Sequence, residues 1–253
     1  MKMLRDIGLL FARPFLQSLH NPAFVIVNLS TPVMYLVLFM PLLKRLSGPG
    51  FGAGHVIQVF LPGIIALLFV AAGTGSVFPT IFELKRGLIE RLRVTPTSRF
   101  GLLVGPILSW AAWTLISSAV IVALSVPFGF HIHPAGLAVF AVLLVLLLTT
   151  FAAWVTAMAV LMKGEITSIS GIVVGLNLPI ILLGGVMLPL ALAPGWLRAL
   201  AHIDPLYYAV QAGRDLAAGA ITTHAVVAAF AVLVPLTALV LWWATQVYRR
   251  AVA

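Results

Sequence analysis

Residues Leu137 to Met162 read LAVFAVLLVLLLTTFAAWVTAMAVLM, a run without a single charge that ends at Lys163. A helix needs about 20 apolar residues to cross the hydrocarbon core of a bilayer. Over the whole chain of 253 residues, 62% are hydrophobic and only 8% are charged. A soluble domain carries about 25% charged residues. The run therefore predicts a membrane-spanning helix, and the composition predicts an all-α membrane protein.

Five more uncharged stretches predict a bundle of six spans with both termini on one side. These stretches are Pro22–Leu43, Val56–Phe82, Phe100–Leu124, Ile166–Leu188 and Ala225–Gln246. Residues 1–20 mix apolar and basic side chains, which favours an amphipathic helix on the membrane surface over an irregular leader. Residues 189–223 form a connection too apolar for a simple loop. We interpret residues 1–253 as one transmembrane domain.

The distribution of basic residues predicts the orientation of the bundle. The net charge is +9, and the cations lie between the uncharged stretches. With cytoplasmic termini, only four of the fifteen Lys and Arg residues face outward: Lys44, Arg45, Arg198 and Arg214. Cytoplasmic segments of membrane proteins are enriched in Lys and Arg. We therefore expect both termini in the cytoplasm and the chain in a bacterial cytoplasmic membrane, with no role in nucleic-acid binding.

Several chemistries have no matching residues in this chain. There is no cysteine, which excludes thiol catalysis and cysteine-based metal sites. None of the four lysines stands in a phosphate-binding loop, so we expect no ATP site and no catalytic residues. All six carboxylates fall outside the predicted spans, which disfavours proton-driven antiport. His131 and His133 lie two apart in a polar turn, and we expect no metal there.

The segment between the second and third spans has the pattern of a short helix, which we place at residues 83–95. Leu84, Leu88 and Leu92 form one apolar stripe, while Glu and Arg residues pair along the remaining surface. Thr95-Pro96 ends the helix, because the residue before proline avoids the α region. The pattern fits both a helix that docks a cytoplasmic partner and a membrane-surface helix without one.

Two stretches resemble the ABC-2 type transporter permeases, the membrane subunits of bacterial ABC exporters. The first, ELKRGLIERLRVTPTSR at residues 83–99, is similar to the family pattern E-x-x-R-G-x-x-E-R-L-x-V-T-P-x-S-R. The second comprises PGWLR at residues 194–198 and AHIDPLYY at residues 201–208, similar to a late segment before the last span. Asp204 stands where asparagine is more usual in the family. The resemblance is greatest to exporters of the daunorubicin-resistance type.

The resemblance implies roles for three groups of residues. In the family, the first stretch is a coupling helix seated on the ATPase subunit, and the second forms short external re-entrant helices. ATPase coupling would then involve Glu83, Arg86, Gly87, Glu90, Arg91, Thr95 and Pro96. The external segment would contribute Pro194, Trp196, Arg198, Asp204, Pro205 and Tyr208. The second and fifth spans line the path in the family, which suggests Thr74, Ser76, Phe78 and Asn177.

We therefore expect a permease subunit that works by alternating access. Its expected partners are a separate ABC ATPase carrying ATP and Mg, a second permease that is the same chain or a related one, and membrane lipids. Uncharged spans suit a hydrophobic or amphipathic cargo, such as an antibiotic or other drug, or a lipid. The alternatives are export of a polysaccharide or polyol phosphate, and an ion-driven carrier or channel.

Overall fold

The computed structural model describes residues 2–46, 53–85, 99–163, 165–186 and 194–252. Helix accounts for 88% of these residues, and no strand is present among them. The helices are α1 (Lys2–Leu19), α2 (Pro22–Leu46), α3 (Ala53–Gly75), α4 (Val77–Lys85), α6 (Arg99–Ser125), η1 (Val126–Phe128), α7 (Pro134–Leu161), α8 (Ile166–Leu183), α9 (Gly195–Ala201), α10 (Pro205–Ala217) and α11 (His224–Val252). The prediction of an all-α protein is confirmed.

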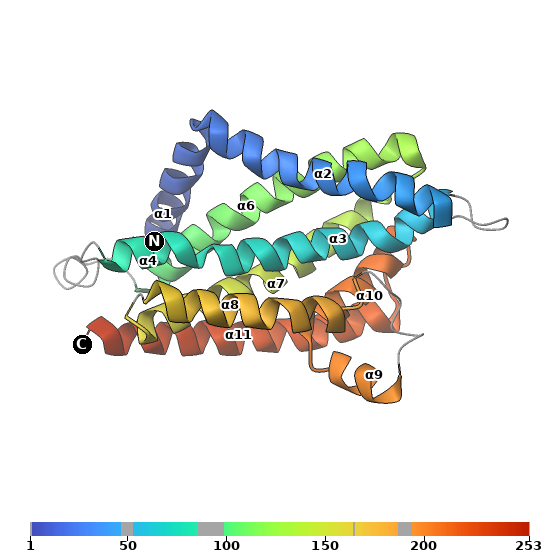
Figure 1. Cartoon of the computed structure of the whole chain (residues 1–253). Helices are drawn as coiled ribbons and strands as arrows, with labels where there is room; N and C mark the ends of the chain where they lie inside the picture. The colour runs from blue at the N-terminus through green and yellow to red at the C-terminus, as the bar shows by residue number, and fades with distance from the viewer. Residues whose placement is uncertain (1, 47–52, 86–98, 164, 187–193, 253) are drawn as a thin grey trace.

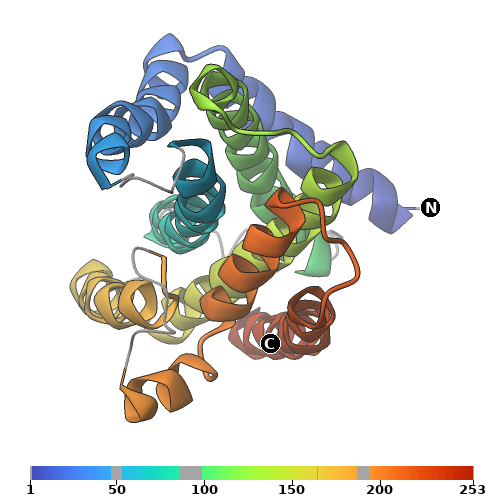
Figure 2. The ribbon, with the colours of Figure 1, turned by 90° about the vertical axis from the view of Figure 1, so that its right-hand side faces the viewer.

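The long helices run side by side, and both termini lie toward the same end of the bundle (Figure 1). Helix α7 is the centre of the packing, because it contacts α3, α6, α10 and α11 (Figure 2). Its side chains Leu143, Leu147 and Leu148 are among the most deeply buried of the described residues. A helix that is apolar all round can be buried on every face, which is why this sequence takes the central position.

Five helical stretches in the described part of the chain are long and apolar enough to cross a membrane. They are Ile57–Phe82, Leu103–Phe128, Pro134–Leu161, Ile166–Leu183 and His224–Arg250. The first predicted span, Pro22–Leu43, falls within α2, but several of its side chains lie outside the described set. The sequence therefore predicts six spans, of which five are identified here by length and composition.

The second predicted span is divided into two helices at Ser76. Helix α3 ends at Gly75 and α4 begins at Val77, while the Ser76 hydroxyl donates to the Gly73 carbonyl at 2.6 Å. A Cβ atom added at Gly73 would lie 2.9 Å from the Leu148 carbonyl oxygen of α7. Small residues allow helices in membranes to approach closely, so Gly73 sets the spacing of α3 and α7.

The fifth helix is shorter and more peripheral than the sequence predicts. We predicted a span to Leu188, whereas α8 ends at Leu183 and is followed by Gly185 with a φ of 62°. Glycine adopts this left-handed conformation without a steric penalty, so it directs the chain away from the helix axis. Only 6% of the apolar window of α8 is buried inside the chain, against 56% for α7.

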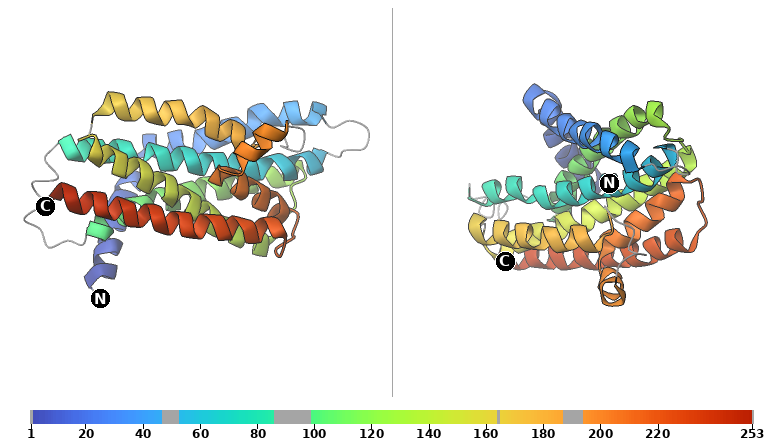
Figure 3. Two further views of the ribbon diagram at one scale, coloured as in Figure 1. Left: turned by 90° about the horizontal axis from the view of Figure 1, so that it is seen from below. Right: turned by 45° about the vertical axis from the view of Figure 1, so that its right-hand side comes forward.

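Helix α1 lies across the bundle rather than along it (Figure 3). It packs against α6, where the Phe15 and Trp113 ring centroids are 5.4 Å apart. A Cβ atom at Gly105 of α6 would meet the Leu10 side chain at 2.5 Å. The close approach of α1 to α6 therefore requires glycine at position 105.

Candidate functional site

The α9–α10 segment, residues 194–217, lies between α8 and α11 in the chain and away from the end that holds the termini (Figure 1). Helix α9 begins after Pro194 and stands clear of the bundle (Figure 3). Helix α10 packs against α3, α7 and α11. Its buried residues are Leu206, Ala209, Val210, Ala212, Gly213, Leu216 and Ala217. This spacing of three and four residues is that of an amphipathic helix, so one face of α10 joins the core.

Asp204 begins α10 and is itself buried, with 5% of its surface exposed. Its Oδ1 accepts a hydrogen bond from the Leu206 backbone N–H at 3.0 Å, and Pro205 occupies the first turn, where its lack of an N–H costs nothing. Its Oδ2 is buried without a hydrogen-bond partner among the described residues. Burial raises the pKa of Asp204 from 3.8 to about 7, a rise that the Leu206 bond partly offsets.

Arg214 connects three parts of the fold from its position on α10. Its Nε donates to the Val59 carbonyl of α3 at 3.1 Å, and its Nη2 donates to the Gly185 carbonyl after α8 at 2.8 Å. Burial lowers the pKa of Arg214, although a guanidinium remains protonated at neutral pH. The side chain therefore holds the end of α8 and the start of α3 against α10.

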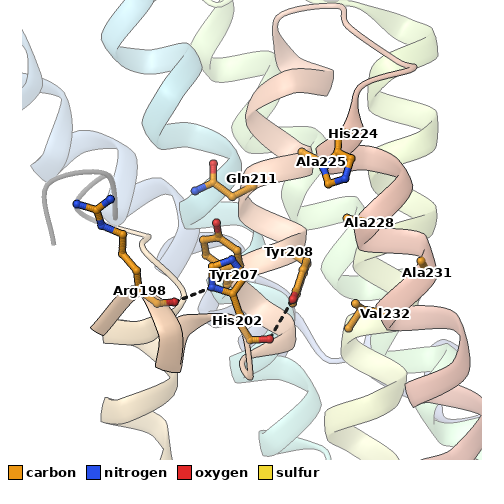
Figure 4. Close-up of a pocket in the computed structure, with 10 residues that line it drawn as sticks. All are labelled: Arg198, His202, Tyr207, Tyr208, Gln211, His224, Ala225, Ala228, Ala231 and Val232. Atoms are coloured by element: carbon orange, nitrogen blue, oxygen red, sulfur yellow. Dashed lines mark hydrogen bonds between the residues drawn. The ribbon is translucent and has the colours of Figure 1, made fainter. Parts of the chain in front are cut away.

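A cavity of about 640 Å³ separates the α9–α10 segment from α11 (Figure 4). The residues that line it are Arg198, His202, Tyr207, Tyr208, Gln211, His224, Ala225, Ala228, Ala231 and Val232. We refer to this cavity as the α10–α11 pocket. One wall is polar and aromatic, whereas the α11 wall below His224 is small and apolar. A cavity of this volume and character is typical of a small-molecule site.

The aromatic residues of the α10–α11 pocket are held in place by one another and by the backbone. The Tyr208 hydroxyl donates to the His202 carbonyl at 3.0 Å (Figure 4). His202 Nδ1 lies 2.7 Å from the Arg198 carbonyl and must donate to it, because a carbonyl oxygen only accepts. The His202 and Tyr207 ring centroids are 5.1 Å apart.

The predicted path residues lie on α3, α4 and α8 and at the turn between α3 and α4. The hydroxyls of Thr74 and Ser76 donate to carbonyls of their own segment, and both residues are buried. Phe78 is 42% exposed. Asn177 of α8 has a buried Oδ1 without a hydrogen-bond partner among the described residues. Their role in a path stays a prediction.

An apolar cluster links the two helices that carry Phe78 and Asn177. It contains Val77 and Ile81 of α4, Val155 and Ala159 of α7 and Ile169 of α8. The helices α4 and α8 are thus joined through α7.

Most of the predicted coupling residues lie outside the described part of the chain. Arg86, Gly87, Glu90, Arg91, Thr95 and Pro96 belong to the interval 86–98. Glu83 lies in α4, which ends at Lys85, and α6 begins at Arg99. The structure therefore describes the helices on either side of the predicted coupling segment, α4 and α6, but not the segment between them.

The comparison with known families decides the identity of this helical bundle. Residues 5–217 match the model of the ABC-2 type transporter family. The chain belongs to the ABC-2 type transporter family. It is a membrane permease subunit of an ABC transporter. Permeases of this family work with an ABC ATPase subunit and generally lack an ATPase site of their own. The resemblance recognised in the sequence is confirmed.

Individual relatives of this ABC-2 permease span most of the chain. It is 28% identical to the transport permease ycf38 of Cyanophora paradoxa over 84% of this chain and 74% of that protein. It is 25% identical to the daunorubicin resistance ABC transporter permease protein DrrB1 of Streptomyces coeruleorubidus, over 79% and 70%. It is 27% identical to ycf38 of Porphyra purpurea, over 83% and 73%.

Sequence reasoning about this ABC-2 permease missed part of the site. Gln211 and His224 line the α10–α11 pocket, and Arg214 makes the contacts to α3 and α8, yet none of the three was predicted to belong to the site. Arg214 had a signal, because it is one of the few charged residues in the mostly apolar connection of residues 189–223. Gln211 and His224 had none, since they come from different helices that only the folded chain brings together.

Proposed function

We propose that this permease exports a hydrophobic or amphipathic compound, a drug or a lipid, from the cytoplasm by alternating access. The observation that carries the proposal is the absence of charge within the five described candidate spans, apart from Arg249 and Arg250 at the end of the last one. A path between such helices offers no counter-charge to an ionic cargo. The likeness to a permease named for daunorubicin resistance supports the same class of cargo.

The energy source in this proposal is a pair of ABC ATPase subunits that bind ATP and Mg. In this proposal residues 83–95, which begin with the end of α4, are the segment that docks on the ATPase, with Glu83, Arg86, Glu90 and Arg91 against it and Gly87 at the closest approach. Thr95-Pro96 sets the exit toward α6. Closure of the ATPase pair then moves α4 and α6 and shifts the bundle from inward- to outward-facing.

The orientation in this proposal has cytoplasmic termini, in a bacterial cytoplasmic membrane. Eleven of the fifteen Lys and Arg residues then face the cytoplasm. The termini and the end of α4 lie toward the same end of the bundle, which agrees with this orientation (Figure 1). The α9–α10 segment accordingly faces the outside.

The second permease of the proposed complex packs against α8. This helix exposes Gly171, Val174, Gly175 and Leu178. A Cβ atom at Gly171 or Gly175 would meet nothing within 4 Å. Two glycines four residues apart allow two helix backbones to approach closely in a membrane. The open surface of α8 is therefore suited to a second copy of this chain or a related one.

The proposed function is tested by reconstituting the permease with its co-purified ATPase in lipid vesicles. We expect ATP-dependent transport of an amphipathic dye, and we expect Glu90→Lys to abolish transport while the chain still inserts. Glu165→Lys is the matched control, because Glu165 is exposed and lies outside residues 83–95. Transport that continues without ATP would identify a carrier or channel instead. Normal ATPase stimulation by Glu90→Lys would refute the docking role of residues 83–95.

A further inference from the structure

The α10–α11 pocket has a polar wall and an apolar wall that face each other. Its apolar wall runs down α11 from His224 through Ala225 and Ala228 to Val232. Eight residues of helix rise about 12 Å, so this wall extends well into the apolar part of the span. The rest of the lining comes from His202 and from Tyr207, Tyr208 and Gln211 of α10, of which Tyr208 lies on the side of α11 (Figure 4).

The polar wall favours a negatively charged group. Arg198 contributes a guanidinium, His202 and His224 contribute ring nitrogens, and none of the described residues that line the pocket carries a carboxylate. The Tyr207 hydroxyl and the Gln211 amide supply further hydrogen-bond donors. Arginine and hydroxyl donors together are the groups that recognise phosphate oxygens.

The two walls together describe a ligand with an anionic head and an apolar tail. A free phosphate ion would leave the alanine wall of α11 unused, and a neutral hydrocarbon would leave the hydrogen-bond donors of the polar wall unused. The pocket lies at the start of the candidate span His224–Arg250, where lipid head groups and acyl chains meet. Its volume of about 640 Å³ is sufficient for a head group and the adjoining part of a chain.

We propose that the α10–α11 pocket binds an anionic phospholipid, with the phosphate on the side of the pocket that carries Arg198 and His202 and one acyl chain along Ala225, Ala228 and Ala231. None of the predicted path residues lines this pocket, so the inference does not depend on the proposed export function. The bound lipid fills the space between the α9–α10 segment and α11 and fixes their separation.

The test titrates the purified permease, in neutral detergent and with any ATPase that co-purifies, with dioleoyl phosphatidylglycerol. We expect saturable thermal stabilisation by this lipid and much less by dioleoyl phosphatidylcholine, because a ligand that binds the folded state stabilises it. Glycerol phosphate, which carries the phosphate but no acyl chain, is titrated in parallel as a soluble control. Equal stabilisation by both lipids would overturn the proposal, and so would equal stabilisation by glycerol phosphate, which would indicate a site for free phosphate.

Paired variants separate occupancy of the pocket from general effects on α11. Ala228→Phe fills the pocket and is expected to remove the response to phosphatidylglycerol, whereas Ala238→Phe places the same ring at an exposed position of α11 outside the pocket and keeps the response. Arg198→Gln is expected to raise the phosphatidylglycerol concentration that gives half-maximal stabilisation by about tenfold or more, since a charge-assisted hydrogen bond is lost. Arg250→Gln is its control. An unchanged midpoint in both Ala228→Phe and Arg198→Gln would overturn the proposal.

Discussion

The side-chain oxygens of Thr150 in α7 and Thr237 in α11 lie 2.8 Å apart, and Thr237 Oγ1 also lies 3.3 Å from the Leu146 carbonyl of α7, between two helices that pack mainly through apolar side chains. Thr237 Oγ1 is also 2.6 Å from the Leu233 carbonyl, and Thr150 Oγ1 is 2.9 Å from the Leu146 carbonyl. Each hydroxyl thus retains a partner in its own helix if the other is removed.

Replacing either threonine of this pair by valine should therefore cost little. We expect Thr150→Val and Thr237→Val to destabilise the protein by about 1 kcal/mol each, with a coupling of about 0.6 kcal/mol in the double variant. The measurement is a double-mutant cycle of unfolding in mixed micelles. Strictly additive effects would show that the hydrogen bond contributes nothing between α7 and α11.

Gly73→Ala should destabilise the bundle, because the new methyl group would lie 2.9 Å from the Leu148 carbonyl oxygen and 3.1 Å from the Phe151 Cβ. Forcing a methyl group into a packed site costs about 1–3 kcal/mol. Gly75→Ala is the matched control, since a Cβ at Gly75 meets nothing within 4 Å. Thermal unfolding in detergent compares the two, and equal midpoints would contradict the close approach of α3 and α7.

Asp204→Asn should change how stability depends on pH. The pKa of Asp204 is raised to about 7 in the folded chain from 3.8, so the carboxyl group favours folding when it is protonated. This contribution is complete below pH 3.8 and is lost as the pH rises to about 7. Between pH 5 and pH 8 the loss is about 3 kcal/mol.

The asparagine variant keeps the Oδ1 acceptor for the Leu206 N–H and carries no titratable group. We expect its unfolding midpoint to vary less between pH 5 and pH 8 than that of the unaltered chain, with Asp215→Asn as control. If the unfolding midpoint of Asp204→Asn fell more steeply with pH than that of the unaltered chain, the burial of a neutral carboxyl group at the start of α10 would be contradicted.

Arg214→Lys should weaken the attachment of α8. The planar guanidinium of arginine directs separate N–H groups at the two carbonyls, whereas lysine has a single ammonium group at the end of a flexible chain. The loss of a charged donor to the Val59 or Gly185 carbonyl costs about 1.5–3 kcal/mol. Limited proteolysis between α8 and α9 reports local opening. Digestion as slow as that of the unaltered chain would show that Arg214 does not hold these segments together.

Cysteine substitution tests the proposed contact of α8 with a second permease directly, since the chain has no cysteine of its own. If two copies associate through α8, Val174→Cys should form a disulfide-linked dimer in membranes upon mild oxidation. Ile169→Cys is the control, because Ile169 is buried within the chain. Cross-linking of Ile169→Cys but not of Val174→Cys would exclude this face. Failure of both would indicate a different partner chain.

Hydropathy and charge predicted the helical nature of this chain, because crossing a bilayer leaves few alternatives to a helix. The predicted stretch Leu137–Met162 ends within one residue of the C-terminal end of α7, Leu161. The early end of α8 was not predicted, although Gly184-Gly185 carried a signal for it. Apolar composition continues through these glycines, so a hydropathy argument cannot detect a change of direction.

The α9–α10 segment shows where sequence reasoning ends. Its apolar character and its prolines predicted a segment that is no simple loop, and Asp204-Pro205 marks the start of α10. The packing of α10 against α7 depends on Gly136, where a Cβ would clash with the Leu216 carbonyl oxygen. This contact joins residues 80 positions apart, so the local sequence around either residue cannot predict it.

The central place of α7 has a consequence for biogenesis. Helices enter the membrane individually and associate afterwards. Helices α3 and α6 both pack on α7, yet they are synthesised before it. They must therefore wait in the bilayer, with the surface around Gly73 not yet covered, until α7 has been synthesised and has itself entered the membrane. A chain that ended before α7 would leave α3 and α6 without the helix on which both pack.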